Sequence, residues 1–549
     1  MNKTLQTDLF GFNETTNISI NEAAENVGVS IATIRNWIKT GYLRQTSKGK
    51  IDNKSFLLFI DEIAGKEKLN SRANKLLKDS HDHQELSSNL NEEINSVDVE
   101  FQYLGDKYEN SLSDSYRNQE GVYYTPESIV KDMLKDLPKN ISTKTFCDPC
   151  CGSGNFLLEA IEHGIPPENI YGFDIDANAI AIAKKRIFEK TGYNSDNIIL
   201  KDFLSEANSI EEYQFDYIFT NPPWGKKIAR QQKEKYALIF NAGKSLDTSA
   251  LFFFASLRIL QEGGQLGFLL PEAFFNISTF ESARKKALSL EIIRLIDYGK
   301  AFKGLVTKAQ AIILTKNYKV KEKYLIKCEE PQKTFQRNNI SFLANPKSIF
   351  NFWLDEESSE VVKTVFNYPH KYLLNNAEWG LGIVTGNNKR FCKSSIEEGY
   401  IPVFKGSDIQ KNSLKKPSNF IPKDTSLYQQ VAPISLYEAE EKLIYKFISS
   451  KLCFFCDTEK RYILNSANML ILNKSFPISS QQLCDLLNSE FMNWIFKNIF
   501  NTHKILRSDL ESLPIHTEYF KQYYKFNEND YLNYLNIRKM NNGTYRIKR

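Results

Sequence analysis

Short hydrophobic runs alternate with amphipathic segments between about residues 120 and 320. The runs predict strands at 145–147, 170–173, 198–200, 217–219, 266–270, 293–296 and 312–314. The amphipathic segments predict helices at 156–161, 177–190, 249–261 and 280–288. Strands that alternate with helices are typical of a mostly parallel, doubly wound α/β sheet, which binds its ligands at the carboxyl ends of its strands.

Residues 1–64 predict a separate small domain. Residues 21–27 have a helical pattern, Gly28 interrupts it, and Ser30 can cap a second helix that runs to about Lys39. This arrangement is a helix-turn-helix, and the segment resembles MerR-like and excisionase-like DNA-binding domains. Residues 35–54 carry one acid, Asp52, and six basic side chains: Arg35, Lys39, Arg44, Lys48, Lys50 and Lys54. The segment predicts a DNA-binding or regulatory module, with a helical hairpin for protein docking as the alternative.

The remaining segments differ in character. Residues 65–118 predict a polar linker, because ten acids and one lysine fall within 79–114 and large apolar residues are scarce. Residues 119–325 form the predicted catalytic domain, and the less regular, aromatic-rich residues 326–516 predict a recognition domain. In residues 517–549, tyrosines alternate with basic residues. That tail either grips a nucleic acid backbone or packs on the domain with a solvated face.

Composition supports this division without identifying a partner. A chain of 549 residues predicts three or four domains, and its formal net charge of +5 is too small to indicate a polyanion. The first ten residues lack the apolar segment of a signal peptide, and the longest apolar run, 250–255, is too short to span a bilayer. The eight cysteines are scattered along the chain. We therefore expect a cytoplasmic protein, without membrane contact, that is nucleoid-associated when bound to DNA.

The first chemical motif is Asp148-Pro149-Cys150-Cys151-Gly152-Ser153-Gly154-Asn155-Phe156, which follows a predicted strand and opens a helix. Its glycines allow a tight turn and a close approach of the backbone to a ligand. Asp148 suits the ammonium of an amino acid moiety, whereas it would repel a pyrophosphate. Asp174 ends the next strand, where it can bind ribose hydroxyls. Asp202-Phe203 ends the strand after that, which places an acceptor for an adenine amino group beside an apolar face. Together these residues predict an adenosine cofactor held by its amino acid tail.

The second motif is Asn221-Pro222-Pro223-Trp224, after the strand at 217–219. An amino group conjugated to an aromatic ring is a poor nucleophile, because its lone pair is delocalised. The Asn221 side-chain oxygen and the Pro222 carbonyl can accept its two hydrogens, so that the lone pair turns towards an electrophilic methyl group. Trp224 can stack on the base.

These motifs resemble the γ-class of N6-adenine DNA methyltransferases, in particular the TaqI-like group with a C-terminal specificity domain. Gly121-Val122-Tyr123-Tyr124-Thr125-Pro126 is similar to the family's segment before the glycine loop, which implies that Thr125 lies near the methionine carboxylate. Phe302 matches the family's aromatic on the other face of a flipped base. The implied catalytic residues are Asn221, Pro222, Trp224 and Phe302. The implied S-adenosylmethionine residues are Tyr124, Thr125, Asp148, Cys150, Gly152, Gly154, Phe156, Asp174, Ile175, Asp202, Phe203 and Pro223.

The resemblance covers about residues 118–515 and is weaker in the recognition domain, where 382–391, 402–409 and 487–490 carry it. It implies a Rossmann-like methyltransferase domain followed by a mixed α/β specificity domain. No metal site is expected, since the single pair Cys453 and Cys456 lacks a second ligand pair.

The function that the resemblance implies is site-specific methylation of a flipped-out adenine in duplex DNA, within a restriction-modification system. Trp224 and Phe302 would sandwich the base. We expect a monomer with a separate cognate restriction endonuclease. The alternatives are a type I modification subunit, an amino methyltransferase acting on RNA or protein glutamine, and a DNA-binding regulator with an inactive methyltransferase fold.

Overall fold

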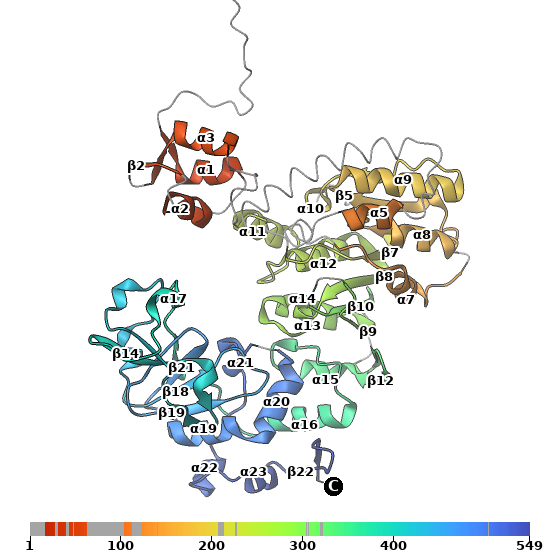
Figure 1. The fold of residues 1–549 in the computed structure, drawn as a ribbon. Helices are drawn as coiled ribbons and strands as arrows, with labels where there is room; N and C mark the ends of the chain where they lie inside the picture. The colour runs from red at the N-terminus through yellow and green to blue at the C-terminus, as the bar shows by residue number, and fades with distance from the viewer. Residues whose placement is uncertain are drawn as a thin grey trace, which may run out of the picture.

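The computed structural model describes residues 17–27, 31–39, 43–47, 49–62, 104–111, 123–139, 141–206, 213–225, 228–302, 305, 307–318, 322–502 and 504–548. A nine-stranded sheet with the order β12-β11-β9-β10-β8-β7-β4-β5-β6 lies at the centre of the catalytic domain (Figure 1). Its strands are β4 (Phe146–Asp148), β5 (Ile170–Asp174), β6 (Ile198–Leu200), β7 (Phe215–Thr220), β8 (Leu260–Pro271), β9 (Glu291–Gly299), β10 (Ala309–Thr315), β11 (Leu325–Glu330) and β12 (Lys333–Asn338). All seven predicted strands are present. The prediction of a mostly parallel sheet is confirmed, with β10 antiparallel to both β8 and β9.

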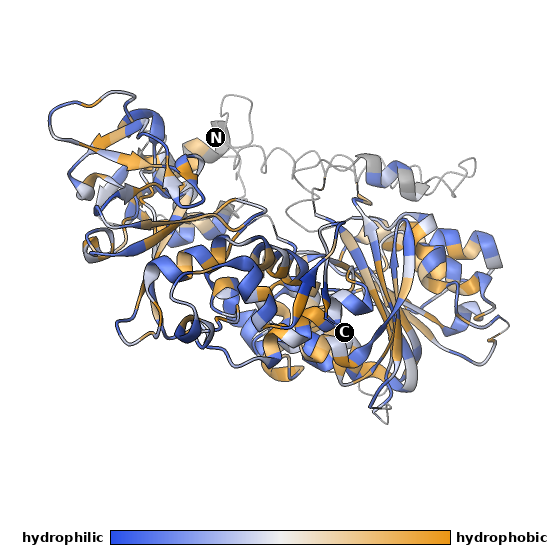
Figure 2. Ribbon diagram, turned by 90° about the horizontal axis from the view of Figure 1, so that it is seen from below, coloured by the Kyte–Doolittle hydropathy of each residue, from blue (hydrophilic) through white to orange (hydrophobic). Residues whose placement is uncertain are grey.

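Successive strand residues point to opposite faces of this sheet, so each face has its own hydrophobic core. In β4, Phe146 belongs to one core and Cys147 to the other, and Phe219 and Ile218 of β7 divide in the same way. Figure 2 shows the hydrophobic residues concentrated along these strands. One core contains α7 (Glu127–Leu134), α8 (Asn155–Glu162) and α9 (Ala177–Thr191). The other contains α10 (Phe203–Glu206), α11 (Arg230–Ile239), α12 (Thr248–Ile259), α13 (Ala273–Asn276) and α14 (Glu281–Leu288).

Two boundaries in the catalytic domain differ from the predictions. The expected domain end at residue 325 is wrong, because β11 begins there and pairs with β9, and β12 then pairs with β11. β11 alternates buried and more exposed positions at its start, β12 has a single buried position, and both contain charged residues, so they lack a hydrophobic run. The helix predicted at 249–261 ends at Ile259, and the chain enters β8 directly at Leu260.

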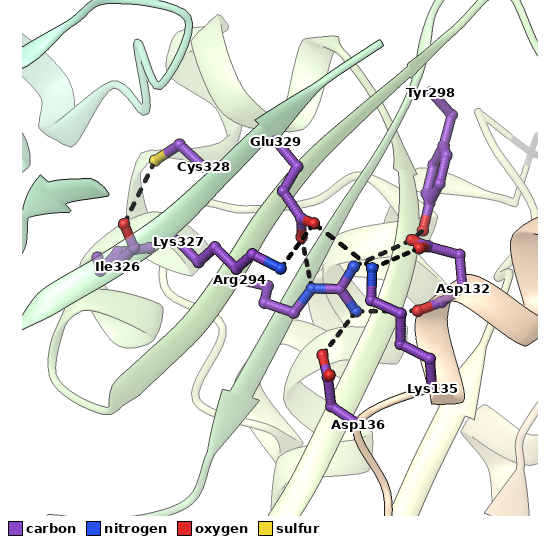
Figure 3. A network of polar contacts seen from close by, with 9 residues as sticks. All are labelled: Asp132, Lys135, Asp136, Arg294, Tyr298, Ile326, Lys327, Cys328 and Glu329. Atoms are coloured by element: carbon purple, nitrogen blue, oxygen red, sulfur yellow. Dashed lines mark hydrogen bonds and ion pairs between the residues drawn. The ribbon is translucent and has the colours of Figure 1, made fainter. Parts of the chain in front are cut away.

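The buried Arg294 links α7 to the sheet through ion pairs (Figure 3). Arg294 on β9 is 1 % exposed and forms ion pairs with Asp132 Oδ2 at 3.0 Å, Asp136 Oδ2 at 3.1 Å and Glu329 Oε2 at 2.6 Å. Tyr298 donates a second hydrogen bond to Asp132 Oδ2, at 2.7 Å. Because α7 begins two residues after Thr125, this network fixes the segment that enters the candidate site.

Replacing Arg294 with methionine is expected to destabilise the protein by about 3 kcal/mol, because three carboxylates lose their common partner. Chemical unfolding monitored by circular dichroism measures this change. Lys131→Met, on the exposed pair of Lys131 with Glu127, is the control, for which we expect a change of about 0.5 kcal/mol or less. Equal stability of both variants would contradict the role of Arg294.

A second folded unit, which we call the second body, follows the catalytic sheet and comprises the elements from α15 to β23. Helices α15 (Asn339–Leu343) and α16 (Glu356–Asn367) lead into a four-stranded sheet, β13-β21-β18-β19, and a three-stranded sheet, β17-β14-β20. Their strands are β13 (Ala377–Leu381), β14 (Tyr400–Phe404), β17 (Asn419–Pro422), β18 (Lys442–Lys446), β19 (Phe454–Asp457), β20 (Tyr462–Ile463) and β21 (Ala467–Leu472). The pair β15 (Ile409–Gln410) and β16 (Ser413–Leu414) and the helices α17 (Asn388–Phe391), α18 (Ile434–Tyr437), α19 (Ser480–Asn488), α20 (Glu490–Phe500) and α21 (Arg507–Leu510) complete it. Cys453 and Cys456 lie in different hydrophobic clusters.

The C-terminal residues belong to the core of this second body, so the predicted end of the recognition domain at residue 516 is too early. They form α22 (Tyr519–Gln522), α23 (Glu528–Tyr534), β22 (Ile537–Lys539) and β23 (Tyr545–Ile547), which lie beside α19 and α16 (Figure 1). Tyr519, Tyr531 and Tyr545 are buried, and the Tyr545 ring lies 4.8 Å from that of Phe491 on α20. Of the two alternatives for this segment, the structure supports packing on the domain.

The N-terminal module consists of β1 (Asn17–Ser19), α1 (Ile20–Val27), α2 (Ile31–Lys39), β2 (Gln45–Ser47), β3 (Lys50–Asp52) and α3 (Asn53–Glu62). Both expected helices are present, while Gly28 and Ser30 lie outside the described residues. Ser19 and Glu22 cap α1 reciprocally, and Trp37 of α2 packs 4.7 Å from Phe59 of α3. No helix within the described ranges is long and apolar enough to cross a membrane.

Candidate functional site

The glycine loop turns from β4 into α8. Gly152 and Gly154 have φ angles of +51° and +92°, in the left-handed region that favours glycine. A methyl group on Gly152 would lie 2.8 Å from Tyr124 Cε1, so the loop backbone and the Tyr124 ring are in direct contact. The loop therefore approaches its surroundings more closely than a side chain would permit.

Asp148 is the one carboxylate of the glycine loop, and it is buried. It is 1 % exposed, and its Oδ1 accepts a hydrogen bond of 3.0 Å from the Cys150 backbone amide. Burial raises the pKa of Asp148 to about 7, although the Thr220 side chain and the Cys150 amide oppose this shift. A buried carboxylate gains most from a cationic partner, since a bound cation compensates its lost hydration. Asp148 therefore fits the ammonium group predicted from the sequence.

Two further acids lie at or near strand ends, since Asp174 ends β5 and Asp202 follows the end of β6 by two residues. Asp174 accepts hydrogen bonds of 2.9 Å from the Gly152 amide at Oδ2 and from the Asp176 amide at Oδ1. Burial raises the pKa of Asp174, and both backbone bonds oppose that shift. Asp202 Oδ1 accepts from the Leu204 amide at 3.0 Å at the start of α10. Each carboxylate retains lone pairs for a ligand.

One cavity joins these groups and has about 920 Å³ of empty space, including the part that is open to solvent. Eleven of the twelve residues predicted to bind the cofactor line it, together with Asn221: Tyr124, Thr125, Asp148, Cys150, Gly152, Phe156, Asp174, Ile175, Asp202, Phe203 and Pro223. Gly154, the remaining one, is the N-cap of α8 and contacts Ala183 and Leu157.

Several lining residues have no signal in the sequence. They are Lys201, Leu204, Ile228, Thr248 and Phe252. Thr248 and Phe252 come from α12, which follows the Asn-Pro-Pro motif by more than twenty residues. Only the folding of α12 against the sheet brings these side chains to the cavity, so local sequence patterns do not indicate them.

Asn221 follows β7, whose six residues are all buried. Its Nδ2 donates a hydrogen bond of 2.7 Å to the Tyr123 carbonyl, which fixes the orientation of the amide. Its Oδ1 is buried and has no hydrogen-bond partner within the described ranges. An unpaired buried acceptor costs about 1–3 kcal/mol, so this oxygen is poised for a donor that a ligand supplies.

The rings of Tyr123, Trp224 and Phe302 form one aromatic cluster, which is linked to Asn221 through the Tyr123 carbonyl. The centroids of Trp224 and Phe302 are 5.3 Å apart with an edge-to-face angle of 85°, and Tyr123 lies 5.6 Å from Phe302. A base between two rings needs about 7 Å between them, since each contact takes about 3.5 Å. The expected sandwich by Trp224 and Phe302 is therefore not preformed, because the two rings contact each other. Trp224 Nε1 also donates to the Leu269 carbonyl at 3.3 Å.

Two family models match parts of this chain. A family model described as N-6 DNA Methylase matches residues 99–366, and one described as TaqI-like C-terminal specificity domain matches residues 401–515. The chain is 51 % identical over 406 residues to the Type II methyltransferase M.VspI of Vibrio sp. (strain 343), covering 74 % of this chain and 99 % of that protein. It is 27 % identical to the Modification methylase CviBIII of Paramecium bursaria Chlorella virus NC1A, covering 34 % and 47 % respectively. The Type IIL restriction-modification enzyme MmeI, solved in complex with DNA, is 14 % identical over 75 % of this chain and 70 % of its own, with a TM-score of 0.49.

Proposed function

The chain belongs to the TaqI-like N6-adenine DNA methyltransferases of restriction-modification systems, and from this premise we propose how its residues methylate duplex DNA. S-adenosylmethionine is the methyl donor of this family. The observation that carries the proposal is the unpaired buried oxygen of Asn221 at the edge of the cofactor cavity. That oxygen requires a hydrogen donor, and an adenine amino group supplies one.

The cavity fits the cofactor in three respects. Asp148 would hold the ammonium of the methionine moiety, Asp174 would accept hydrogen bonds from the ribose hydroxyls, and Asp202 beside Phe203 would accept one from the adenine amino group. The glycine loop, in which Gly152 lies against the Tyr124 ring, would contact the methionine part of the cofactor through its backbone. When bound, S-adenosylmethionine supplies an electrophilic methyl group on its sulfonium.

Asn221 and Pro222 act on the target amino group. Asn221 Oδ1 and the Pro222 carbonyl each accept one of its hydrogens, which withdraws the nitrogen lone pair from the adenine ring and directs it towards the cofactor. The Asn221 amide cannot rotate freely, since Nδ2 is bound to the Tyr123 carbonyl. The new nitrogen–carbon bond would form as the bond between the methyl group and the sulfonium sulfur breaks. The surplus proton on the methylated nitrogen would stay hydrogen-bonded to these two acceptors until it passes to solvent. No covalent enzyme intermediate is required.

The target adenine must leave the duplex, because its amino group is inaccessible to the cofactor inside the helix. The ring cluster of Tyr123, Trp224 and Phe302 supplies an apolar surface for the flipped base. Since Trp224 and Phe302 contact each other, one ring moves aside as the base enters. Stacking on the remaining rings offsets part of the few kcal/mol that unstacking costs.

The domains divide the remaining tasks. The second body, with the TaqI-like specificity domain, reads the target sequence, and the N-terminal helix-turn-helix module adds contacts to the DNA backbone. The chain acts as a monomer in the cytoplasm, where its DNA substrate lies, and a separate endonuclease performs cleavage. The match covers 99 % of M.VspI, which is named a methyltransferase. This supports a separate endonuclease.

Removing positive charge from the N-terminal module is expected to weaken DNA binding without slowing catalysis. Arg35, Arg44 and Lys54 are exposed. Their combined replacement by alanine should lower the slope of log Kd against log salt concentration by about 0.9 for each phosphate that the module no longer neutralises, with kcat unchanged at saturating DNA. Fluorescence anisotropy with labelled duplex measures the slope. Glu25→Ala combined with Gln45→Ala, both exposed in the same module, is the control, and an unchanged slope in the triple variant would exclude DNA binding by this surface.

The substrate class is tested by incubating the purified protein with tritiated S-adenosylmethionine and either plasmid DNA, total RNA or a protein extract. We expect label in DNA alone, at one recurrent sequence that methylation-sensitive sequencing identifies. Label in RNA or protein with clean DNA would overturn the proposal in favour of an amino methyltransferase with another substrate. Activity that depends on a separate sequence-reading subunit would instead identify a type I modification subunit.

A further inference from the structure

A short helix from the expected linker lies against the cofactor site. Helix α5 (Leu104–Ser111) falls within residues 65–118, whose composition predicts a chain that does not fold by itself. Nevertheless, Tyr108 on this helix is fully buried and Gly105 is buried as well. The segment is therefore ordered by contacts with the catalytic domain.

The hydroxyl of Tyr108 bonds to an acid next to the ribose-binding strand end. It donates to Asp176 Oδ2 at 2.6 Å, a short bond that is typical of a hydroxyl and a carboxylate. Asp176 Oδ1 accepts from the backbone amides of Asn178 at 2.9 Å and Ala179 at 3.4 Å, as the N-cap of α9. Both oxygens of Asp176 are thus occupied, one by α9 and the other by α5.

Asp176 is linked directly to the carboxylate that we assign to the ribose. Its backbone amide donates to Asp174 Oδ1 at 2.9 Å, and Gly152 of the glycine loop donates to Asp174 Oδ2 at 2.9 Å. A continuous chain of hydrogen bonds therefore runs from Tyr108 through Asp176 and Asp174 to Gly152. A displacement of Asp176 would turn the Asp174 carboxylate and shift the loop.

A second contact of α5 reaches the same loop from another side. A methyl group on Gly105 would lie 2.8 Å from Ser153 Oγ, so the helix backbone lies directly on the loop. Behind Ser153, Arg186 of α9 donates to the Ser153 carbonyl at 2.7 Å and to Asn155 Oδ1 at 2.8 Å. The loop is consequently clamped between α5 and α9.

We propose that α5 is a positioning element of the cofactor site, which sets the geometry of the ribose-binding carboxylate and the glycine loop through Tyr108 and Gly105. This inference rests on the proposed function, since it assigns Asp174 to the cofactor ribose. Tyr108 acts through Asp176 and touches neither substrate nor cofactor. Cofactor affinity therefore depends on a segment that precedes the Tyr-Tyr-Thr-Pro motif and has no motif of its own.

The test compares Tyr108→Phe with Tyr437→Phe in the full-length protein. Tyr437 is also fully buried and donates one hydrogen bond, to the Leu381 carbonyl at 2.8 Å in the second body. Isothermal titration of S-adenosylmethionine without DNA gives Kd, steady-state kinetics give KM and kcat, and thermal unfolding gives Tm. For Tyr108→Phe we expect a Kd and a KM for the cofactor that are five- to tenfold higher, with kcat at saturating cofactor within twofold of wild type. Tyr437→Phe should lower Tm without changing Kd.

Two further variants separate positioning from folding. Gly105→Ala perturbs the glycine loop at the contact between Gly105 and Ser153. It should also raise the Kd for S-adenosylmethionine. Combining Tyr108→Phe with Asp176→Asn should raise Kd by less than the product of the two single effects, because the residues act through one bond. An unchanged Kd in Tyr108→Phe and Gly105→Ala would overturn the inference while the proposed function stands. A wild-type protein that binds no S-adenosylmethionine would instead refute the proposed function.

Discussion

Asn221→Ala is expected to abolish methyl transfer while cofactor binding survives. The substitution removes the buried Oδ1 that we assign to the target amino group, and without it the nitrogen lone pair stays delocalised into the adenine ring. Loss of one such preorganised group typically costs 10²–10³-fold in kcat, and here we expect a decrease of about 10³-fold or more. Single-turnover transfer from tritiated S-adenosylmethionine measures the rate, and calorimetry without DNA measures cofactor affinity.

Asn221→Asp is the matched control. It retains an acceptor oxygen but loses the Nδ2 group that donates to the Tyr123 carbonyl, so it should keep more activity than the alanine variant. A rate in Asn221→Ala within tenfold of wild type would rule out the assigned role. A loss of cofactor binding equal to the loss of rate would place Asn221 in the cofactor site instead.

Asp148→Asn is expected to weaken S-adenosylmethionine binding by about 100-fold at pH 7.5, because the ammonium loses a buried anionic partner. In the wild-type protein, the Asp148 carboxyl has a pKa of about 7. Below that pH the carboxyl is protonated and neutral, so the cofactor Kd should rise about tenfold for each pH unit below 7. Above about pH 8 affinity should fall again, since an α-amino group has a pKa of about 7.7–8.0. Calorimetric titrations between pH 5.5 and 9 measure both limbs.

Asp148→Asn is also expected to change the thermal stability of the cofactor-free protein. A pKa raised on folding means that the folded state favours the protonated carboxyl, so Asp148 lowers the stability of the fold progressively between about pH 4 and pH 7, and the full loss persists above pH 7. Asp148→Asn should therefore raise Tm at pH 8 in the absence of cofactor, and it should remove the acid limb of the binding profile. A variant that keeps the wild-type pH profile would exclude Asp148 as the ammonium ligand.

Most of the residues that line the candidate cofactor cavity can be predicted from the sequence, because they lie at or close to strand ends. Asp148, Asp174 and Asn221 each end or follow a hydrophobic strand, and adjacent parallel strands bring their carboxyl ends together. Once the strands were assigned, the order of motifs was enough to place these side chains around one cavity. The glycine loop can be placed in the same way, because it follows β4 and opens α8.

The rest depends on tertiary packing that no local pattern encodes. The linker composition gave no sign that Tyr108 would be buried against Asp176, and β11 and β12 joined the sheet without a hydrophobic run. The pattern of tyrosines in the C-terminal segment is compatible both with DNA binding and with a hydrophobic core. Only the tertiary structure shows that Tyr519, Tyr531 and Tyr545 are buried. Likewise, the family pattern places Trp224 and Phe302 on two faces of a base but does not indicate that the rings contact each other in its absence.

The central claim is that the Asn221 oxygen selects an adenine amino group, and the methylated nucleoside tests it most directly. Plasmid DNA is methylated by the purified protein with deuterated-methyl S-adenosylmethionine, digested to nucleosides and analysed by mass spectrometry. The account predicts that the heavy methyl appears in N6-methyladenine alone and disappears with Asn221→Ala. Heavy methyl in N4-methylcytosine or 5-methylcytosine, or undiminished N6-methyladenine from the alanine variant, would contradict it.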